Sequence, residues 1–162
     1  MVGIGYDIHR LVENRTLYLG GVKIDFSKGL AGHSDGDVLI HAICDALLGA
    51  ANLGDIGLHF PPDDERYKDI SSIELLKHVR KFLERSNFKP MNIDAVVIAE
   101  EPKILTYVKS MRENIANALH TPAEIISIKG KTNEGLGDIG MGNAIAAWAV
   151  CEVGRIYASP EG

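Results

Sequence analysis

The stretch SDGDVLIHAICDALLGAANLG, residues 34–54, carries the clearest structural signal in the chain. Ser34 is a favourable helix N-cap, Asp37 stands three residues later in a position like that of a capping box, and Gly54 closes the stretch. Between them, apolar residues recur at helical spacing. The pattern therefore predicts a helix over residues 35–51.

The flanking segments read alternately as strands and helices. β-branched and aromatic residues open the chain, and Gly20–Gly21 predicts a bulge or bend between two strand segments. Strands are predicted over 1–8, 16–26, 93–100, 125–131 and 143–158, and further helices over 71–87 and 104–120. This order indicates an α/β fold, an α+β sandwich with a single mixed sheet covered by helices on one face. The chain of 162 residues is expected to be one domain, 1–162.

Composition excludes several classes of protein. The formal net charge of -5 gives no basic field for nucleic acid, and no apolar run is long enough for a membrane span. An anionic substrate would need local cations in its own site. Cys44 and Cys151 are far apart and are expected to be core thiols. We expect a cytoplasmic protein, or one in a plastid or other organelle if a transit peptide has been removed.

Three residues suggest a metal site. Asp7 and His9 are two positions apart in a predicted strand, so their side chains point to the same face. With His41 of the first helix they would form a three-ligand set with an open fourth position, as in catalytic zinc sites. From spacing alone other roles stay open: Asp7 could cap a turn, and either histidine could be structural.

Asp37, His41 and Asp45 recur every four residues on the first helix. They form a polar stripe on an otherwise apolar element. Asp37 or Asp45 is therefore predicted to orient the His41 imidazole from behind.

The motifs GYDIHRL, GGVKI, GLAGHSDGDVLIHAICDALLGAANLGDIGLHFP, AEEPKI and KTNE resemble, in order and spacing, those of the 2-C-methyl-D-erythritol 2,4-cyclodiphosphate synthase family. The resemblance covers nearly the whole chain. It implies a homotrimer with active sites between subunits, and zinc held by Asp7, His9 and His41.

The implied reaction is cyclisation of 4-diphosphocytidyl-2-C-methyl-D-erythritol 2-phosphate. The 2-phosphate attacks the β-phosphorus and CMP leaves, in the non-mevalonate route to isoprenoids. A phosphate monoester is mostly dianionic at neutral pH, its second pKa being about 6, so the nucleophile needs no strong general base. The resemblance assigns Glu134 to a second ion, Mg²⁺ or Mn²⁺, and Thr132 and Lys103 to the diphosphate.

The resemblance also implies contacts to the substrate. His33 and Ser34 would lie near the methylerythritol phosphate, and Asp55 and Gly57 near the ribose. Without the resemblance these positions read as a helix cap and a helix-ending turn. Phe60 and the acidic run after it are expected to form a mobile lid. The full set of predicted substrate-binding residues is His33, Ser34, Asp55, Ile56, Gly57, Phe60, Asp64, Ala99, Pro102, Lys103, Ile104, Leu105, Lys131 and Thr132.

Two other functions remain open on the residues alone. Two histidines and an aspartate could hold Fe(II) as the facial triad of an oxygenase, although such ligands normally come from a β-barrel. Alternatively, the chain could be a trimeric scaffold that binds nucleotides without turnover.

The chain departs from its family in the run GMGNA, residues 140–144. Many members carry GRGEG here, and their arginines hold an isoprenoid diphosphate on the trimer axis. Met141 and Asn143 stand in place of that Arg and Glu. A thioether cannot neutralise a diphosphate, so this chain is predicted to bind such ligands poorly.

Overall fold

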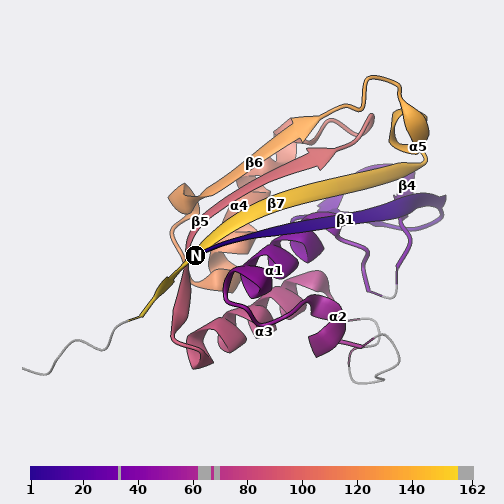
Figure 1. Ribbon diagram of the computed structural model, residues 1–162. Helices are drawn as coiled ribbons and strands as arrows, with labels where there is room; N and C mark the ends of the chain where they lie inside the picture. The colour runs from indigo at the N-terminus through magenta and orange to yellow at the C-terminus, as the bar shows by residue number, and fades with distance from the viewer. Residues whose placement is uncertain (33, 62–66, 68–69, 157–162) are drawn as a thin grey trace, which may run out of the picture.

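The computed structural model describes residues 1–32, 34–61, 67 and 70–156. Its main layer is a five-stranded sheet with the strand order β4-β1-β7-β5-β6 (Figure 1). The strands are β1 (Val2–Glu13), β4 (Lys28–Leu30), β5 (Phe88–Ile98), β6 (Ile126–Lys131) and β7 (Ala144–Arg155). Only the β5–β6 pair is parallel among the described pairs, and the others are antiparallel. The predicted mixed sheet is confirmed.

Three helices cover one face of this sheet, as Figure 1 shows. They are α1 (Val38–Ala50), α3 (Ser72–Arg85) and α4 (Val108–Leu119). Short turns of helix complete the chain, namely α2 (Ile56–His59), η2 (Ile104–Tyr107), η3 (Ala123–Ile125) and α5 (Gly137–Gly140). The predicted placement of the helices on one face is confirmed, and the third helix begins with the tighter turn η2.

Glycines let α1 lie directly on β1. A Cβ built on Gly5 would be 1.9 Å from the carbonyl oxygen of Ala42, and one built on Gly3 would be 2.2 Å from that of Ala46. Any side chain there would push the helix away from the strand. This close approach sets the position of α1 relative to the residues that follow Gly5 on the same face of β1.

The predicted bend at Gly20–Gly21 is confirmed, and it takes the form of a tight turn. They join β2 (Leu17–Leu19) to the antiparallel strand β3 (Val22–Ile24), and both have positive φ, 59° and 70°. Glycine adopts that backbone conformation without steric cost. The segment is thus a separate hairpin, and the predicted bend between two strand segments is its turn.

The start of α1 also differs from the prediction. The N-cap is Asp37, whose side chain accepts a hydrogen bond from the Ile40 backbone N–H, and the helix runs from Val38 to Ala50. Ser34 lies before it in a loop. Both residues are good caps, so the local sequence did not decide between them.

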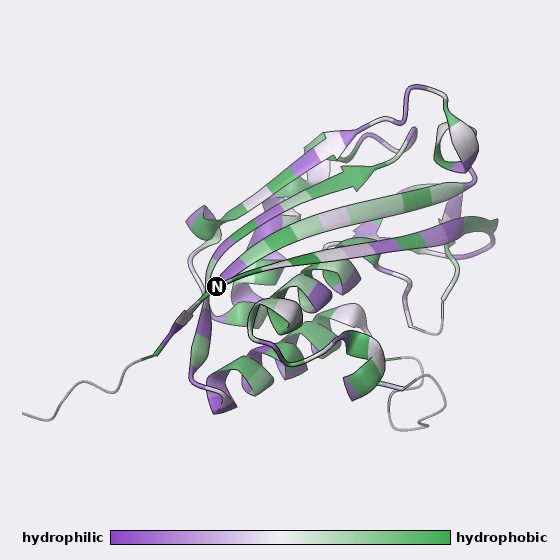
Figure 2. Ribbon diagram, in the orientation of Figure 1, coloured by the Kyte–Doolittle hydropathy of each residue, from purple (hydrophilic) through white to green (hydrophobic). Residues whose placement is uncertain are grey.

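The sheet face away from the helices has an apolar area on β1 and β7. Alternate residues of β1 (Val2, Ile4, Tyr6 and Ile8) are between 43% and 67% exposed, and Trp148 and Val150 of β7 are 41% and 44% exposed. Figure 2 shows green, hydrophobic bands on both strands, interrupted on β1 by purple, hydrophilic ones. The Tyr6 and Trp148 rings pack together across the two strands, with centroids 4.5 Å apart. This uncovered face is well suited to contact with another protein surface.

Two smaller findings concern the cysteines and the helices. Cys44 and Cys151 are free and buried, as predicted. Within the described ranges, none of the helices has the length and apolar character that a membrane crossing requires.

Candidate metal centre and nucleotide pocket

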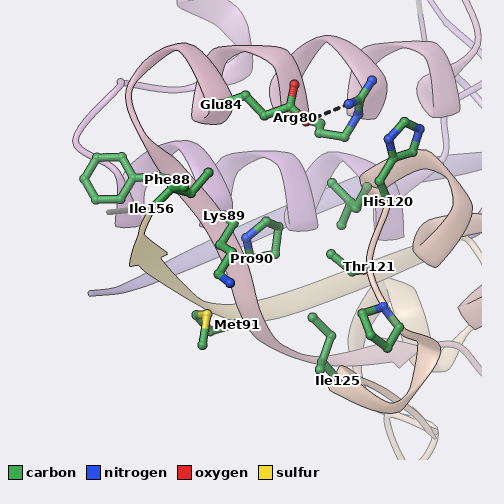
Figure 3. Close-up of a pocket in the computed structure, with 12 residues that line it drawn as sticks. Arg80, Glu84, Phe88, Lys89, Pro90, Met91, His120, Thr121, Ile125 and Ile156 are labelled. Carbon is green, nitrogen blue, oxygen red and sulfur yellow. Dashed lines mark hydrogen bonds and ion pairs between the residues drawn. The ribbon is translucent and has the colours of Figure 1, made fainter. Parts of the chain in front are cut away.

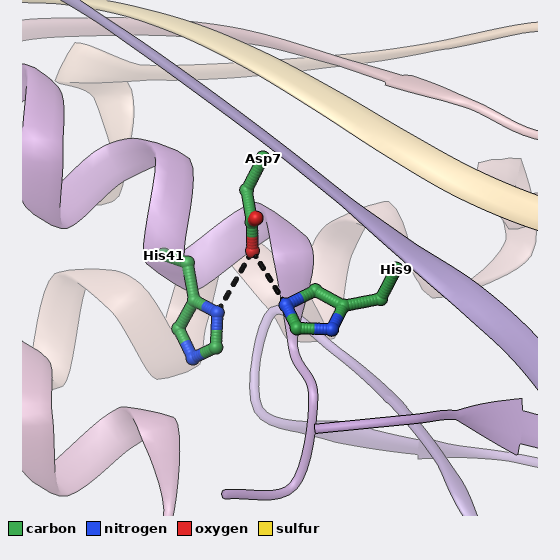
Figure 4. Close-up of side chains that lie close together, drawn as sticks. All are labelled: Asp7, His9 and His41. Atoms are coloured by element: carbon green, nitrogen blue, oxygen red, sulfur yellow. Dashed lines mark hydrogen bonds and ion pairs between the residues drawn. The ribbon is translucent and has the colours of Figure 1, made fainter. Parts of the chain in front are cut away.

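Asp7, His9 and His41 come together beside the start of α1 (Figure 4). Asp7 Oδ2 lies 2.9 Å from His9 Nε2 and 2.9 Å from His41 Nδ1. One ligand atom from each residue lies within 4.8 Å of the others. Asp7 and His9 reach this point because they continue the helix-facing side of β1 after Gly3 and Gly5.

The ring nitrogen of His9 that points away from Asp7, here called the outer nitrogen, is hydrogen-bonded. Nδ1 donates a hydrogen bond to the carbonyl oxygen of Ala31, so Nε2 faces Asp7. The hydrogen bond to Asp7 raises the pKa of His9, although burial works in the opposite direction. Burial acts to raise the pKa of Asp7. The hydrogen bonds from His41 and His9 outweigh this effect and lower the pKa of Asp7 well below its usual range.

The outer nitrogen of His41 also has partners. Nε2 lies 2.9 Å from Ser72 Oγ and 3.2 Å from Ser34 Oγ, and the residue is 7% exposed. Both rings are therefore held from behind by their outer nitrogens. When these nitrogens carry the protons, the inner nitrogens present lone pairs beside the Asp7 carboxylate. Such an arrangement of donors fits a divalent cation.

The prediction that Asp37 or Asp45 orients His41 is wrong. Asp37 is fully buried and accepts hydrogen bonds from the backbone N–H groups of Gly20, Gly21 and Ile40. It joins the β2–β3 turn to the start of α1. Asp45 accepts a hydrogen bond from the Ile56 backbone N–H at 2.8 Å and holds the start of α2.

A second cluster lies where β5 and β6 end. A pocket of about 250 Å³ is formed there by the β5 end, the loop that follows it and the end of β6. Seven of the predicted substrate-binding residues line it: Ala99, Pro102, Lys103, Ile104, Leu105, Lys131 and Thr132. The Glu101–Pro102 peptide bond in this loop is cis.

The KTNE loop adjoins this pocket. Glu134 has a positive φ of 53°, and its carboxylate accepts a hydrogen bond from Thr132 Oγ1 at 3.0 Å. Glu100 from the pocket loop accepts hydrogen bonds from the backbone N–H groups of Asn133 (2.8 Å) and Gly135 (3.2 Å). Glu100 therefore holds the KTNE loop in place, a role that sequence reasoning missed because the two loops are far apart in the chain.

The remaining predicted residues lie around α2 or before α1. Asp55 caps α2 by accepting from the Leu58 backbone N–H, and Gly57 is exposed in the same turn. Ser34 faces His41, and Arg15 Nη2 donates to the carbonyl oxygen of Ser34 and so holds this loop. His33 and Asp64 lie outside the described residues.

Phe60, which was predicted to belong to a mobile lid, is buried in this structure. It is 9% exposed, and its ring packs against Tyr67, His78 and Phe82 with centroid distances of 5.0, 5.9 and 6.0 Å. The side chain is therefore an anchor on α3. Most of the acidic run after it lies outside the described residues.

A different pocket, shown in Figure 3, opens at the start of β5 between α3 and η3. Of the predicted site residues that the structure describes, none lines it. The metal cluster and the pocket at the end of β5 are themselves separated in one chain, because β7 lies between β1 and β5. Two strand spacings amount to about 10 Å.

The fold and the site define a class of protein, an α+β sandwich with a three-residue cluster that could hold a metal ion and a separate pocket built by loops. A sequence model of the YgbB family matches residues 1–154, and the chain belongs to that family.

Relatives and solved structures agree with this assignment. The 2-C-methyl-D-erythritol 2,4-cyclodiphosphate synthase of Chloroherpeton thalassium is 56% identical over 155 residues, which is 96% of this chain and 99% of that protein. The bifunctional IspDF of Campylobacter jejuni superposes with a TM-score of 0.91 at 40% identity, over 96% of this chain and 42% of that one. The CDP complex of IspF from Plasmodium falciparum gives a TM-score of 0.84 at 38% identity, over 96% of each chain.

Proposed function

We propose that the chain converts 4-diphosphocytidyl-2-C-methyl-D-erythritol 2-phosphate to 2-C-methyl-D-erythritol 2,4-cyclodiphosphate and CMP. The observation that carries this proposal is the convergence of Asp7, His9 and His41 in a chain whose relatives bear the name of this synthase. In the reaction, an oxygen of the 2-phosphate forms a bond to the β-phosphorus. The bond from that phosphorus to the bridging oxygen breaks, and CMP leaves with the electron pair.

We propose that Asp7, His9 and His41 hold zinc. The donor set supports this, because two imidazole nitrogens and one carboxylate oxygen match a catalytic zinc site and leave a position open. When bound, such an ion supplies Lewis-acid stabilisation of phosphate oxygens. The side chains themselves are held before any metal arrives, His9 by the Ala31 carbonyl oxygen and His41 by hydroxyl groups.

The pocket at the end of β5 would receive the cytidine diphosphate group. The loop over residues 99–105 would contact cytosine largely through backbone groups, and Lys103 and Thr132 would face the diphosphate. Both side chains line the same pocket, which supports the assignment. Lys103, together with Lys131 of the same pocket, would supply local positive charge in a chain whose net charge is -5.

Glu134 is proposed to hold the second ion, Mg²⁺ or Mn²⁺. Its carboxylate is exposed beside Thr132, and hard cations prefer such oxygen ligands. The Glu100 bonds to the neighbouring backbone fix the loop, so Glu134 would meet the ion with little rearrangement. No proton transfer is needed at the nucleophile, since the attacking phosphate is already ionised.

The working form is proposed to be a homotrimer with each active site shared by two subunits. Two observations support this. The apolar face of β1 and β7 is uncovered in a single chain. The metal cluster and the nucleotide pocket are separated within one chain, so a neighbour that brings its own pocket to the metal cluster would complete the site. Asp55, Ile56 and Gly57 would then contact the ribose from the adjacent subunit, and Ser34 would face the methylerythritol phosphate.

A direct assay tests the proposed function. Purified protein loaded with Zn²⁺ and Mg²⁺ should release stoichiometric CMP from the cytidyl substrate, with the cyclic diphosphate detected by ³¹P NMR. Binding of CDP with an intact substrate after incubation would instead identify a scaffold that only binds nucleotides. Purification with iron in the site, together with loss of activity on zinc loading, would favour the oxygenase alternative.

A further inference from the structure

Ser72 and Asp35 form a chain of hydrogen bonds behind His41. Ser72 is the first residue of α3, is fully buried, and places its hydroxyl 2.9 Å from His41 Nε2. The same hydroxyl donates to Asp35 Oδ1, and the Ser72 backbone N–H donates to Asp35 Oδ2 at 3.0 Å. Asp35 thus binds Ser72 through both carboxylate oxygens.

The donor in each hydrogen bond between Asp35, Ser72 and His41 can be assigned. A serine hydroxyl has a single proton to donate and two lone pairs. The Asp35 carboxylate can only accept hydrogen bonds, so the Ser72 hydroxyl donates its hydrogen bond to Asp35. The Ser72 oxygen must then accept a hydrogen from His41, which puts a proton on Nε2. The opposite nitrogen, Nδ1, faces the Asp7 carboxylate at 2.9 Å and hydrogen-bonds to it, and a metal ion would take the place of that hydrogen.

Ser34 is the other hydroxyl near this nitrogen. Its oxygen is 3.2 Å from Nε2 and accepts a bond from the Gly36 backbone N–H at 3.4 Å. Both distances are longer than that between Ser72 and His41, and no carboxylate fixes the direction of the Ser34 hydroxyl among the bonds described for it. Ser72 is therefore the stronger determinant of the orientation of the ring.

We propose that Asp35 and Ser72 are positioning residues for the metal centre. They hold the His41 imidazole with Nε2 protonated and Nδ1 free to bind the metal, and Asp35 acts only through Ser72. This inference rests on the metal site of the proposed function. Loss of such an outer partner typically weakens metal binding about 10- to 100-fold.

The main test measures the zinc affinity of Ser72→Ala by competition with a chelating dye, without substrate. We expect the affinity to fall about 10- to 100-fold. Ser71→Ala is the matched control, because Ser71 caps the same helix by accepting from the Glu74 backbone N–H but faces solvent. The control variant weakens the start of α3 and leaves the bond to His41 intact. It should bind zinc as the wild type does.

Two further measurements separate positioning from general loosening of the fold. In ¹⁵N-labelled, zinc-loaded protein, the His41 Nε2–H should give a correlation protected from solvent exchange, which Ser72→Ala should lose. Asp35→Ala should also weaken zinc binding, and the Asp35→Ala/Ser72→Ala double variant should be no weaker than Ser72→Ala alone. Asp35→Ala keeps the Ser72 side chain and tests the pair if Ser72→Ala does not fold.

Wild-type affinity in Ser72→Ala, an equal loss in Ser71→Ala, or additive losses in the double variant would each overturn the proposal. These measurements use no substrate. A failure to release CMP would therefore count against the proposed function and leave the positioning pair standing.

Discussion

His41 Nδ1 lies 2.9 Å from Asp7 Oδ2, although 34 positions in the sequence separate the two residues. The contact joins the first helix to the first strand at the point where Gly3 and Gly5 let them touch. The candidate metal centre is therefore built by the same packing that forms the core, and its geometry should persist in metal-free protein.

This relationship gives the first prediction. His41→Ala should leave a folded protein that retains no zinc and has no measurable turnover, because the remaining two ligands cannot replace an imidazole. Metal analysis and circular dichroism of the purified variant would check it. His120→Asn is a suitable control, since His120 is exposed at the end of α4 with a positive φ that asparagine tolerates. Full zinc occupancy in His41→Ala would remove that residue from the site.

Zinc affinity should depend on pH. The hydrogen bond to Asp7 raises the pKa of His9 above the ordinary value of 6.5, despite the opposing effect of burial. A protonated imidazole cannot bind metal, so affinity should fall as pH decreases, beginning at a higher pH than for an ordinary histidine. Chelator competition between about pH 8 and pH 5.5 covers this range. A decline that begins only below the ordinary pKa would contradict the prediction.

The metal-free protein should show the opposite trend in stability. A raised pKa in the folded state means that the His9–Asp7 pair stabilises the fold at low pH. That contribution is lost as pH rises through the raised pKa of His9. Asp7, whose pKa is lowered, contributes stability above its ordinary pKa and loses it only in strong acid. Thermal unfolding of chelator-treated protein across the same pH range measures the contribution of the His9–Asp7 pair to stability.

Binding of the second metal should be weakened without any effect on zinc binding. Glu134→Gln should slow cyclisation at least tenfold and raise the Mg²⁺ concentration needed for half-maximal rate, because an amide is a much weaker ligand than a carboxylate. Zinc content should stay unchanged, since Asp7, His9 and His41 are untouched. A magnesium titration identical to that of the wild type would show that Glu134 is not the ligand.

Much of this arrangement could be predicted from local pattern. Asp7 and His9 share a face by simple alternation, and His41 follows from the helix and the family motifs. Asp37 could not be placed, because Ser34 and Asp37 are both good caps and the deciding bonds come from Gly20 and Gly21. The Asp35–Ser72 pair spans 37 positions and has no local signature.

A single charge added to the apolar sheet face of β1 and β7 should disrupt the trimer. Ile4 is 64% exposed in the single chain, so Ile4→Lys should fold but should dissociate the trimer and abolish activity if active sites are shared. Ser110→Lys, on the exposed side of α4, is the control and should stay trimeric. Sedimentation velocity with an activity assay on each species decides the matter. An active monomer would refute both the trimer and the shared site.

The last prediction concerns Met141, which is the C-cap residue of α5 and is 66% exposed in the single chain. Asn143, two residues later, points its amide towards Asp138, with Nδ2 and Oδ1 3.4 Å apart. Neither side chain offers a positive charge. In the trimer that the family resemblance implies, three thioethers would therefore stand where that resemblance would place arginines. Moving a diphosphate into such surroundings without a cation is strongly unfavourable.

Calorimetric titration with geranyl diphosphate, in the presence of excess CDP to block the active sites, should show no saturable binding. Met141→Arg should restore it, whereas Met91→Arg, a charge added at an exposed methionine of β5, should not. Micromolar binding to the unaltered protein would show that the protein recognises the anion through other groups.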